Sequence, residues 1–234
     1  MENLFLKYMR ERTGKKKSPV KTKVTPGPVI TISREYGCPG RRIAQLLANT
    51  LSEKNRRLGV EKEWRWISKE IIEESARALK LTPSLIQDLS DYKHNSFFEN
   101  LALFFSDDYY PGDAKIKNTI AKFINDEAVQ GHVIILGRAG EAITKNMNDS
   151  FHVKLQAPFE WRIENVAADE GLTISEAKKQ CVEQDRRRAM FRNYFEKDKP
   201  DIDFFDVIFN CKEMTDEEIV EILVIISETR GFVY

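Results

Sequence analysis

The stretch from residue 28 to residue 44 reads Pro28-Val29-Ile30-Thr31-Ile32-Ser33-Arg34-Glu35-Tyr36-Gly37-Cys38-Pro39-Gly40-Arg41-Arg42-Ile43-Ala44. It joins an apolar, β-branched run, typical of a strand, to a loop with two glycines and then to a helical pattern. In such a strand–loop–helix unit, backbone N–H groups and the helix N-terminus can hold a phosphate. The loop lacks the lysine of the G-x-x-x-x-G-K-[ST] motif, because Arg41 follows Gly40. We therefore interpret it as a phosphate loop with altered chemistry.

Short apolar strands and amphipathic helices alternate over the rest of the chain. The pattern predicts strands over 29–33, 64–67, 133–136, 151–155 and 205–209. It predicts helices over 40–58, 69–80, 83–106 and 115–130, a helix after the fourth strand, and helices over 173–195 and from 215 onward. The last two begin with capping boxes. Continuous apolar strands that alternate with helices predict an α/β fold, a three-layer parallel five-stranded sheet.

Composition limits the class of protein. The 234 residues are enough for one domain with a sizeable core. Lys and Arg number 37, as do Asp and Glu, so the zero net charge argues against nucleic acid and against a membrane surface as partners. Three widely spaced cysteines indicate reduced thiols of a cytoplasmic protein. No apolar run is long enough to span a bilayer.

The first 27 residues differ in composition from the rest. They hold eight Lys or Arg residues against two Glu residues and end in a Pro/Gly-rich turn. We interpret residues 1–27 as a basic, loosely ordered tail. The alternative is contact with nucleic acid or lipid through the basic segment 15–23.

Arginines cluster in the loops expected at one edge of the sheet. Ligands of an open parallel sheet bind beyond the carboxyl ends of its strands. The segments after the first, third and fourth strands all carry arginine, whose planar fork suits a phosphate or a carboxylate. The candidate phosphate-binding residues are Ser33, Arg34, Gly37, Gly40, Arg41, Arg42, Arg138, Arg162, Asp185 and Arg188.

Each candidate has a structural alternative. The first loop could be an ordinary turn with solvated arginines, and Arg138 or Arg162 could pair with a nearby carboxylate. Asp185 and Arg188, three residues apart on the helix over 173–195, could belong to a solvated charged face. Against that alternative, the helix ends in aromatic residues and a charged segment follows it, as expected for a hinged basic helix that closes as a lid.

Other kinds of chemistry have less support. The histidines His94, His132 and His152 are not at metal-ligand spacing, and no Cys–His pairing is evident. Phosphoryl transfer instead requires positioning and positive charge on the transferring oxygens. Several arginine-bearing segments that converge on one crevice of a neutral protein favour that reaction.

Five motifs in order carry a resemblance to a known family. They are the stretch from Val29 to Ala44, Val-Ile-Ile-Leu-Gly-Arg-Ala-Gly at 133–140, Ala-Pro-Phe-Glu-Trp-Arg-Ile-Glu at 157–164, Asp185 with Arg188-Ala189, and Phe-Asp-Val-Ile-Phe-Asn at 205–210. Together they resemble the cytidylate kinase-like family, over about residues 28–226. The resemblance implies a P-loop kinase fold over 28–234, with a helical monophosphate-binding insertion at about 68–115 and a lid at about 164–200.

The resemblance also implies an activity and residue roles. It implies ATP- and Mg²⁺-dependent transfer to a nucleoside monophosphate, CMP or dCMP first, with Arg138 on the acceptor phosphate. Arg188 and Arg162 match lid arginines that neutralise charge, and Asp185 matches their acidic partner. Arg41 or Arg34 would replace the missing lysine. We keep two alternatives: a catalytically weak or inactive nucleotide-binding regulatory module, and a kinase for a different small molecule.

Departures from the cytidylate kinases proper concentrate in the first loop. There Arg34, Pro39 and Gly40 stand for the first glycine, the third glycine and the lysine. Arg42 stands for the hydroxyl residue that holds Mg²⁺, which leaves Ser33 as the candidate for that role.

Overall fold

A computed structural model describes residues 27–68, 114–197 and 199–233. Nearly all of the predicted tail, the helices predicted over 69–80 and 83–106, and most of the predicted insertion lie outside these residues. Residues 26–67 and 124–234 form one compact unit, which contains the whole sheet.

Five parallel strands form the sheet, in the order β2-β3-β1-β4-β5. The strands are β1 (Val29–Arg34), β2 (Arg65–Ile67), β3 (Val133–Leu136), β4 (Ser150–Gln156) and β5 (Val207–Asn210). β1 is central and pairs with β3 on one side and β4 on the other, so that Val29 lies opposite Val133 and Ser150. The predicted α/β fold with a parallel five-stranded sheet is confirmed.

The helices follow the predicted order. They are α2 (Gly40–Arg57), α6 (Ala114–Gln130), α7 (Gly140–Ile143), α8 (Phe159–Glu170), α9 (Ile174–Phe195) and α10 (Asp216–Thr229). The two predicted capping boxes are present: Thr173 and Thr215 each cap the N-terminus of their helix through a glutamate three residues later. The boundaries of α9 agree with prediction because its N-terminus has this local signal.

Two elements differ from the prediction. The four-residue helix α7 was not predicted, since one turn is too short to show a hydrophobic period. The fifth strand was predicted over 205–209 but runs from Val207 to Asn210. Phe204 and Phe205 are buried in the loop before it, so their apolar character reflects packing and not strand pairing.

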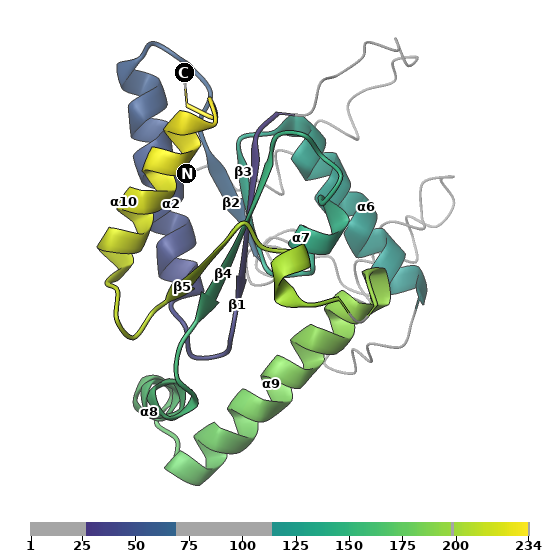
Figure 1. Ribbon diagram of the computed structural model, residues 1–234, viewed down its shortest axis with the longest axis vertical. Coiled ribbons are helices and arrows are strands. Elements are labelled where there is room, and N and C mark those ends of the chain that lie inside the picture. Colours follow the sequence, from purple (N-terminus) through teal and green to yellow (C-terminus); the bar gives the residue numbers. More distant parts are fainter. Residues whose placement is uncertain (1–26, 69–113, 198, 234) are drawn as a thin grey trace, which may run out of the picture. The chain divides into compact units, whose positions relative to one another are not determined.

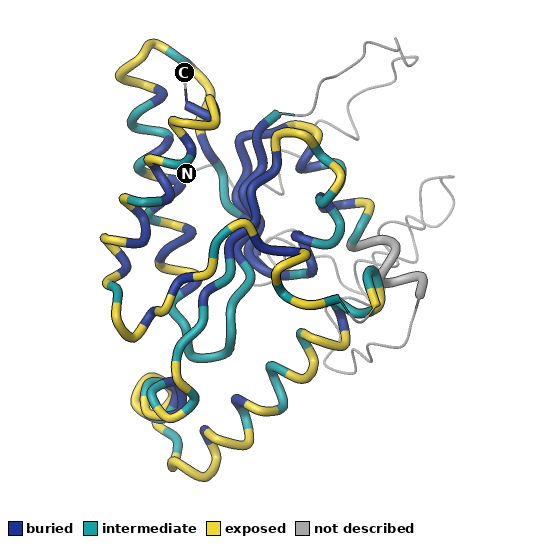
Figure 2. Tube along the Cα trace, viewed as in Figure 1, coloured by how far each residue is buried: buried dark blue, intermediate teal, exposed yellow. Residues whose placement is uncertain are grey.

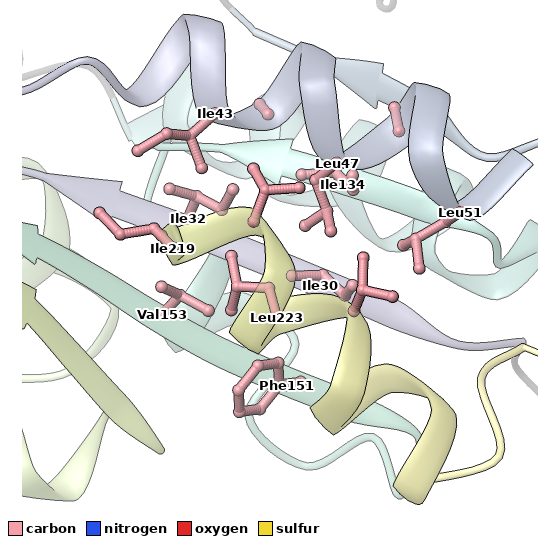
Figure 3. Packing of buried hydrophobic residues seen from close by; sticks show 14 of the residues in the cluster. Ile30, Ile32, Ile43, Leu47, Leu51, Ile134, Phe151, Val153, Ile219 and Leu223 are labelled. Atoms are coloured by element: carbon pink, nitrogen blue, oxygen red, sulfur yellow. The ribbon is translucent and has the colours of Figure 1, made fainter. Parts of the chain in front are cut away.

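A hydrophobic core lies between one face of the sheet and the pair α2 and α10 (Figures 1 and 3). The opposite face is covered as well: a Cβ at Gly140, the first residue of α7, would touch Thr31 and Ile135. Most residues of β1, β3 and β4 are buried whichever face they point to (Figure 2), which explains the continuous apolar sequences of β1 and β3. The core residues shown are Ile30, Ile32, Ile43, Leu47, Leu51, Ile134, Phe151, Val153, Ile219 and Leu223. In the part of the chain that the structure describes, no helix is both long and apolar enough to cross a membrane.

Replacement of Leu47 by alanine tests this core. Leu47 on α2 is fully buried, so we expect Leu47→Ala to lower the free energy of unfolding by about 2–5 kcal/mol. Leu58→Ala, at a residue just after the same helix that is 61% exposed, is the matched control and should change it by less than about 0.5 kcal/mol. Urea denaturation measures both. Equal effects of the two substitutions would contradict the packing described here.

His132 is a buried imidazole next to the start of β3. Its backbone has a positive φ of 52°, and its ring lies 5.3 Å from the ring of Trp64. Neither ring nitrogen has a hydrogen-bond partner. Burial, with the positive charges of Lys62 and Arg65, lowers the pKa of His132 to about 4. The folded protein therefore holds this histidine neutral.

A pH dependence of stability follows from His132. Below its ordinary pKa of 6.5 the unfolded chain binds a proton that the folded protein excludes until about pH 4. Above pH 6.5 His132 is neutral in both states and does not reduce the free energy of unfolding. Between pH 6.5 and 4 that free energy decreases, by up to about 1.4 kcal/mol per pH unit. In His132→Asn, where asparagine tolerates the positive φ, we expect a shallower slope in that window. Denaturation curves at a series of pH values measure it, and an unchanged slope would contradict the assignment.

Candidate functional site

The loops after β1, β3 and β4 lie side by side at one edge of the sheet. The order β3-β1-β4 places the carboxyl end of β1 between those of its two neighbours. The predicted arginine-bearing segments after these strands are therefore adjacent, at the place where parallel sheets bind ligands. All of them belong to the same compact unit.

The loop between β1 and α2 packs tightly against α8. Gly37 has a φ of 89°, and a Cβ there would come within 2.8 Å of the Arg162 carbonyl oxygen. Four loop N–H groups already have acceptors within the protein: that of Tyr36 donates to Asp185 Oδ1 at 2.7 Å, and those of residues 35, 38 and 40 donate to backbone carbonyl oxygens. In the first turn of α2, the N–H groups of residues 41 and 42 have no acceptor within the helix.

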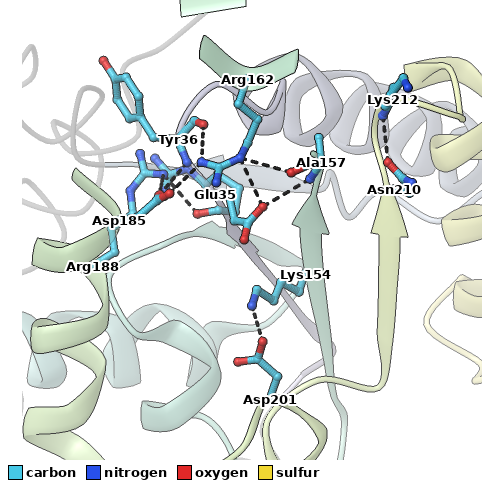
Figure 4. A network of polar contacts seen from close by, with 11 residues as sticks. Glu35, Tyr36, Lys154, Ala157, Arg162, Asp185, Arg188, Asp201, Asn210 and Lys212 are labelled. Carbon is cyan, nitrogen blue, oxygen red and sulfur yellow. Dashed lines mark hydrogen bonds and ion pairs between the residues drawn. The ribbon is translucent and has the colours of Figure 1, made fainter. Parts of the chain in front are cut away.

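Arg162 lies at the centre of a buried ionic network (Figure 4). Its side chain, one turn into α8, donates to Asp185 Oδ2 at 2.6 Å and to the carbonyl oxygens of Tyr36 and Ala157 at 3.0 and 3.2 Å. Its Nε lies 3.3 Å from Glu35 Oε2. Only 6% of the residue is exposed. Arg162 therefore holds the loop, α8 and α9 together, a role that differs from the predicted direct contact with phosphate.

Asp185 and Arg188, three residues apart on α9, both contact the first loop. Arg188 Nη1 donates to the Arg34 carbonyl oxygen at 3.0 Å, and its guanidinium lies 5.2 Å from the centre of the Tyr36 ring. The two charged groups of Asp185 and Arg188 are 3.9 Å apart. Asp185 thus accepts both from a backbone N–H group of the loop and from Arg162.

The Arg34 side chain runs along the edge of the sheet from β1 toward the loop after β3. Glycines make room for it: a Cβ at Gly40 would lie 3.2 Å from Arg34 Cγ, and a Cβ at Gly137 would collide with Arg34 Nη1. The structure therefore brings Arg34 next to the segment that contains Arg138.

Arg138 occupies a strained loop that meets the end of α9. Arg138 and Ala139 both have positive φ values, 59° and 53°, and the Arg138 guanidinium lies 5.9 Å from the centre of the Phe191 ring. Glu141, just beyond, is buried, and burial raises its pKa although Arg192 and Arg34 oppose the shift. The loop after β3 and the C-terminal half of α9 are therefore neighbours.

Arg41 and Arg42 turn away from the other arginines. Arg42 pairs with Asp216 at 3.1 Å and Glu217 at 2.7 Å on α10. The Arg41 guanidinium lies 6.0 Å from the Trp66 ring of β2. The predicted concentration of three arginines in the first loop thus separates into Arg34 directed along the sheet edge, Arg41 next to β2 and Arg42 paired with α10.

Sequence reasoning missed several polar residues of this edge. Lys154 of β4 lies opposite Ser33 of β1 and pairs with Asp201, which also binds Arg192 at 3.1 Å. A lone lysine within the apolar run of β4 was the available signal. Glu35 and Tyr36 gave no signal beyond their position in the loop.

Few protein side chains at this edge of the sheet could coordinate a divalent cation. Among the described residues no group of three or more His, Cys, Asp or Glu side chains is arranged to hold a metal. The nearby carboxylates, Glu35 and Asp185, are already bound by Arg162. Ser33, next to the last residue of β1, brings a hydroxyl group to this edge. This donor set fits a Mg²⁺ ion held mainly by phosphate oxygens and water.

Relatives of known name match parts of the chain. A uronate isomerase from Corynebacterium glutamicum is 31% identical over 99 residues, which are 42% of this chain and 19% of that protein. A cytidylate kinase from Pyrococcus horikoshii is 29% identical over 42% of this chain and 50% of its own length. A cytidylate kinase from Sulfolobus acidocaldarius is 27% identical over 50% of this chain and 63% of its own length. The chain therefore spans less than two thirds of each of these relatives.

One solved structure and one family model extend the match to most of the chain. An uncharacterized protein from Eubacterium ventriosum superposes with a TM-score of 0.57 at 17% identity, over 86% of this chain and 98% of that one, which shows a shared fold. The model of the cytidylate kinase-like family matches residues 29–213, from the first residue of β1 to a point just beyond β5. The chain belongs to the cytidylate kinase-like family.

Proposed function

We propose that the protein transfers the terminal phosphoryl group of ATP to the phosphate of a nucleoside monophosphate, with CMP or dCMP as the preferred acceptor. The observation that carries the proposal is the set of contacts that link three arginine-bearing segments at the carboxyl edge of a parallel sheet: Arg188 binds the Arg34 carbonyl oxygen, the Arg34 guanidinium lies against Gly137, and the next residue, Arg138, lies against Phe191 of α9. Membership of the cytidylate kinase-like family supports a kinase. The preference for cytosine rests on the family and on two relatives named cytidylate kinase.

The donor phosphates would lie between the N-terminus of α2 and Arg34. The first turn of α2 supplies backbone N–H groups and a partial positive charge. Arg34, which reaches from β1 to Gly137, would take the place of the absent lysine. Mg²⁺, with Ser33 as its protein ligand, would neutralise charge on the donor phosphates. Arg42 is not assigned to this site, because Asp216 and Glu217 bind it.

The acceptor phosphate would bind to Arg138, and Arg188 would lie between donor and acceptor. As the phosphoryl group moves, negative charge spreads over its oxygens, and a guanidinium at that point lowers the barrier. The α9 face with Arg188 already lies against the first loop. In this proposal Arg162 and Asp185 hold α8 and α9 in place and do not touch the transferred group.

A second candidate function has its own supporting observation. Asp185 already accepts a hydrogen bond from the Tyr36 N–H group, and the loop lacks the lysine of the phosphate-loop motif. A site with an internal carboxylate and no lysine also suits a module that binds nucleotide without turnover. An assay of ADP release with ATP, Mg²⁺ and CMP, dCMP, UMP or AMP distinguishes the two. Turnover with a cytidine nucleotide supports the kinase, and binding without turnover for every acceptor supports the module.

Arginine substitutions test the site. We expect Arg188→Ala to reduce kcat by about 10²–10³, the loss seen when a donor that stabilises transition-state charge is removed. Arg187→Ala is the matched control. Arg187, the neighbour of Arg188 on α9, has a side chain that is 59% exposed and pairs with Glu183, so turnover should be unchanged. Full activity of Arg188→Ala would show that the residue is outside the reacting site.

Arg138→Ala tests the acceptor side separately. Because Arg138 is proposed to bind the acceptor phosphate, its loss should raise the KM for CMP by about tenfold or more, as expected for a charge-assisted contact of about 1.5–3 kcal/mol. The KM for ATP should change little. Initial rates at varied concentrations of each nucleotide separate the two constants, and a selective rise in the KM for ATP would reverse the assignment.

A further inference from the structure

Tyr36 of the first loop makes an unusual number of contacts with α8 and α9. Its hydroxyl group donates to Glu170 Oε1 at 2.5 Å, at the end of α8, and accepts from Gln180 Nε2 at 2.8 Å, on α9. Its backbone N–H donates to Asp185, and its carbonyl oxygen accepts from Arg162. Every one of these partners lies on the α8–α9 hairpin.

The same side chain packs into a small core of the hairpin. Ile163 and Val166 of α8 and Ala177 and Cys181 of α9 form a cluster that is separate from the main core. Tyr36 packs against this cluster. The loop thus reaches the hairpin through an aromatic ring embedded in apolar contacts, with the hydroxyl group fixed by two polar partners. Burial and the Glu170 carboxylate raise the pKa of Tyr36, so the hydroxyl remains a donor.

The fixed ring provides a platform for Arg188. The Arg188 guanidinium lies 5.2 Å from the ring centre, within the range of a cation–π contact. Its Nη1 donates to the Arg34 carbonyl oxygen, two residues before Tyr36. Arg188 is therefore placed by the first loop from two sides, and the orientation of the ring depends on Glu170 and Gln180.

We propose that Tyr36 is a positioning residue that holds Arg188 against the first loop, so that phosphate loop and α9 act as one unit. This inference rests on the proposed function, in which Arg188 stabilises the transferred phosphoryl group. Tyr36 itself does not touch the substrate. Its effect on catalysis passes through Arg188, which makes the proposal testable by a double-mutant cycle.

The cycle compares Tyr36→Ala, Arg188→Ala and the double variant by kcat and KM. We expect Tyr36→Ala to reduce kcat by about tenfold, the effect of a partly buried cation–π contact, with little change in KM. In the Arg188→Ala background the same substitution should change kcat by less than about twofold. Arg187→Ala is the control background, in which the tenfold effect should persist.

Other outcomes are informative as well. A tenfold loss that persists in the Arg188→Ala background would overturn the proposal, because Tyr36 would then act independently of Arg188. Tyr36→Phe keeps the ring and its packing but removes the hydroxyl contacts. If Tyr36→Ala fails to fold, Tyr36→Phe replaces it in the cycle. The expected loss of kcat is then smaller, and it should again disappear in the Arg188→Ala background.

A binding measurement separates this proposal from the proposed function. The affinity for inorganic tripolyphosphate, measured by calorimetry, requires no turnover. If the wild-type protein turns over no nucleotide, the proposed function fails, and the cycle is evaluated from these affinities. Non-additive losses of affinity for Tyr36→Ala and Arg188→Ala support the positioning role, and additive losses overturn it.

Discussion

The ion pairs of the buried Arg162 side chain join the first loop to α8 and α9. A guanidinium that is 6% exposed requires partners, because an unpaired charge in the interior is strongly unfavourable. Glu35 and Asp185 provide them from the first loop and from α9. With Arg162 itself on α8, the α8–α9 hairpin and a loop more than a hundred residues before it in the sequence are fixed to one group. Removal of either acid would leave a buried positive charge incompletely compensated, which generally costs more than the pair contributes.

The predicted lid, which includes α9, is attached to the first loop by several contacts. The sequence suggests a basic helix that closes over a ligand, but the contacts of Arg162 and Tyr36 tie the α8–α9 hairpin to the first loop. Motion of the hairpin relative to the loop would break several hydrogen bonds at once. A ligand phosphate that bound the Tyr36 N–H group would also have to displace the Asp185 carboxylate. Binding at the loop and the position of α9 are therefore energetically linked.

Much of the fold could be predicted from local patterns. The strands and most helices follow hydrophobic periods, and the capping boxes of Thr173 and Thr215 gave the start of α9 and α10. Less of the candidate site could be predicted from the sequence. Arginines at loop positions indicate which residues lie near the sheet edge, but the direction of each side chain depends on distant partners. Arg42 binds acids on α10, and Arg162 is enclosed by Glu35 and Asp185. Partners that are distant in the sequence produce no periodic pattern from which they could be predicted.

The geometry around Gly40 connects two departures from the common phosphate-loop sequence. A Cβ at that position would press on Arg34 Cγ and on a methyl group of Leu136, both at 3.2 Å. The arginine that stands for the first glycine thus fills the volume where a longer side chain at position 40 would begin. A lysine at position 40 would therefore compete with Arg34 for the same volume, and both Arg34 and Leu136 would have to shift to admit it. An engineered loop that restores the lysine should be packed best when Arg34 is replaced by a smaller residue at the same time.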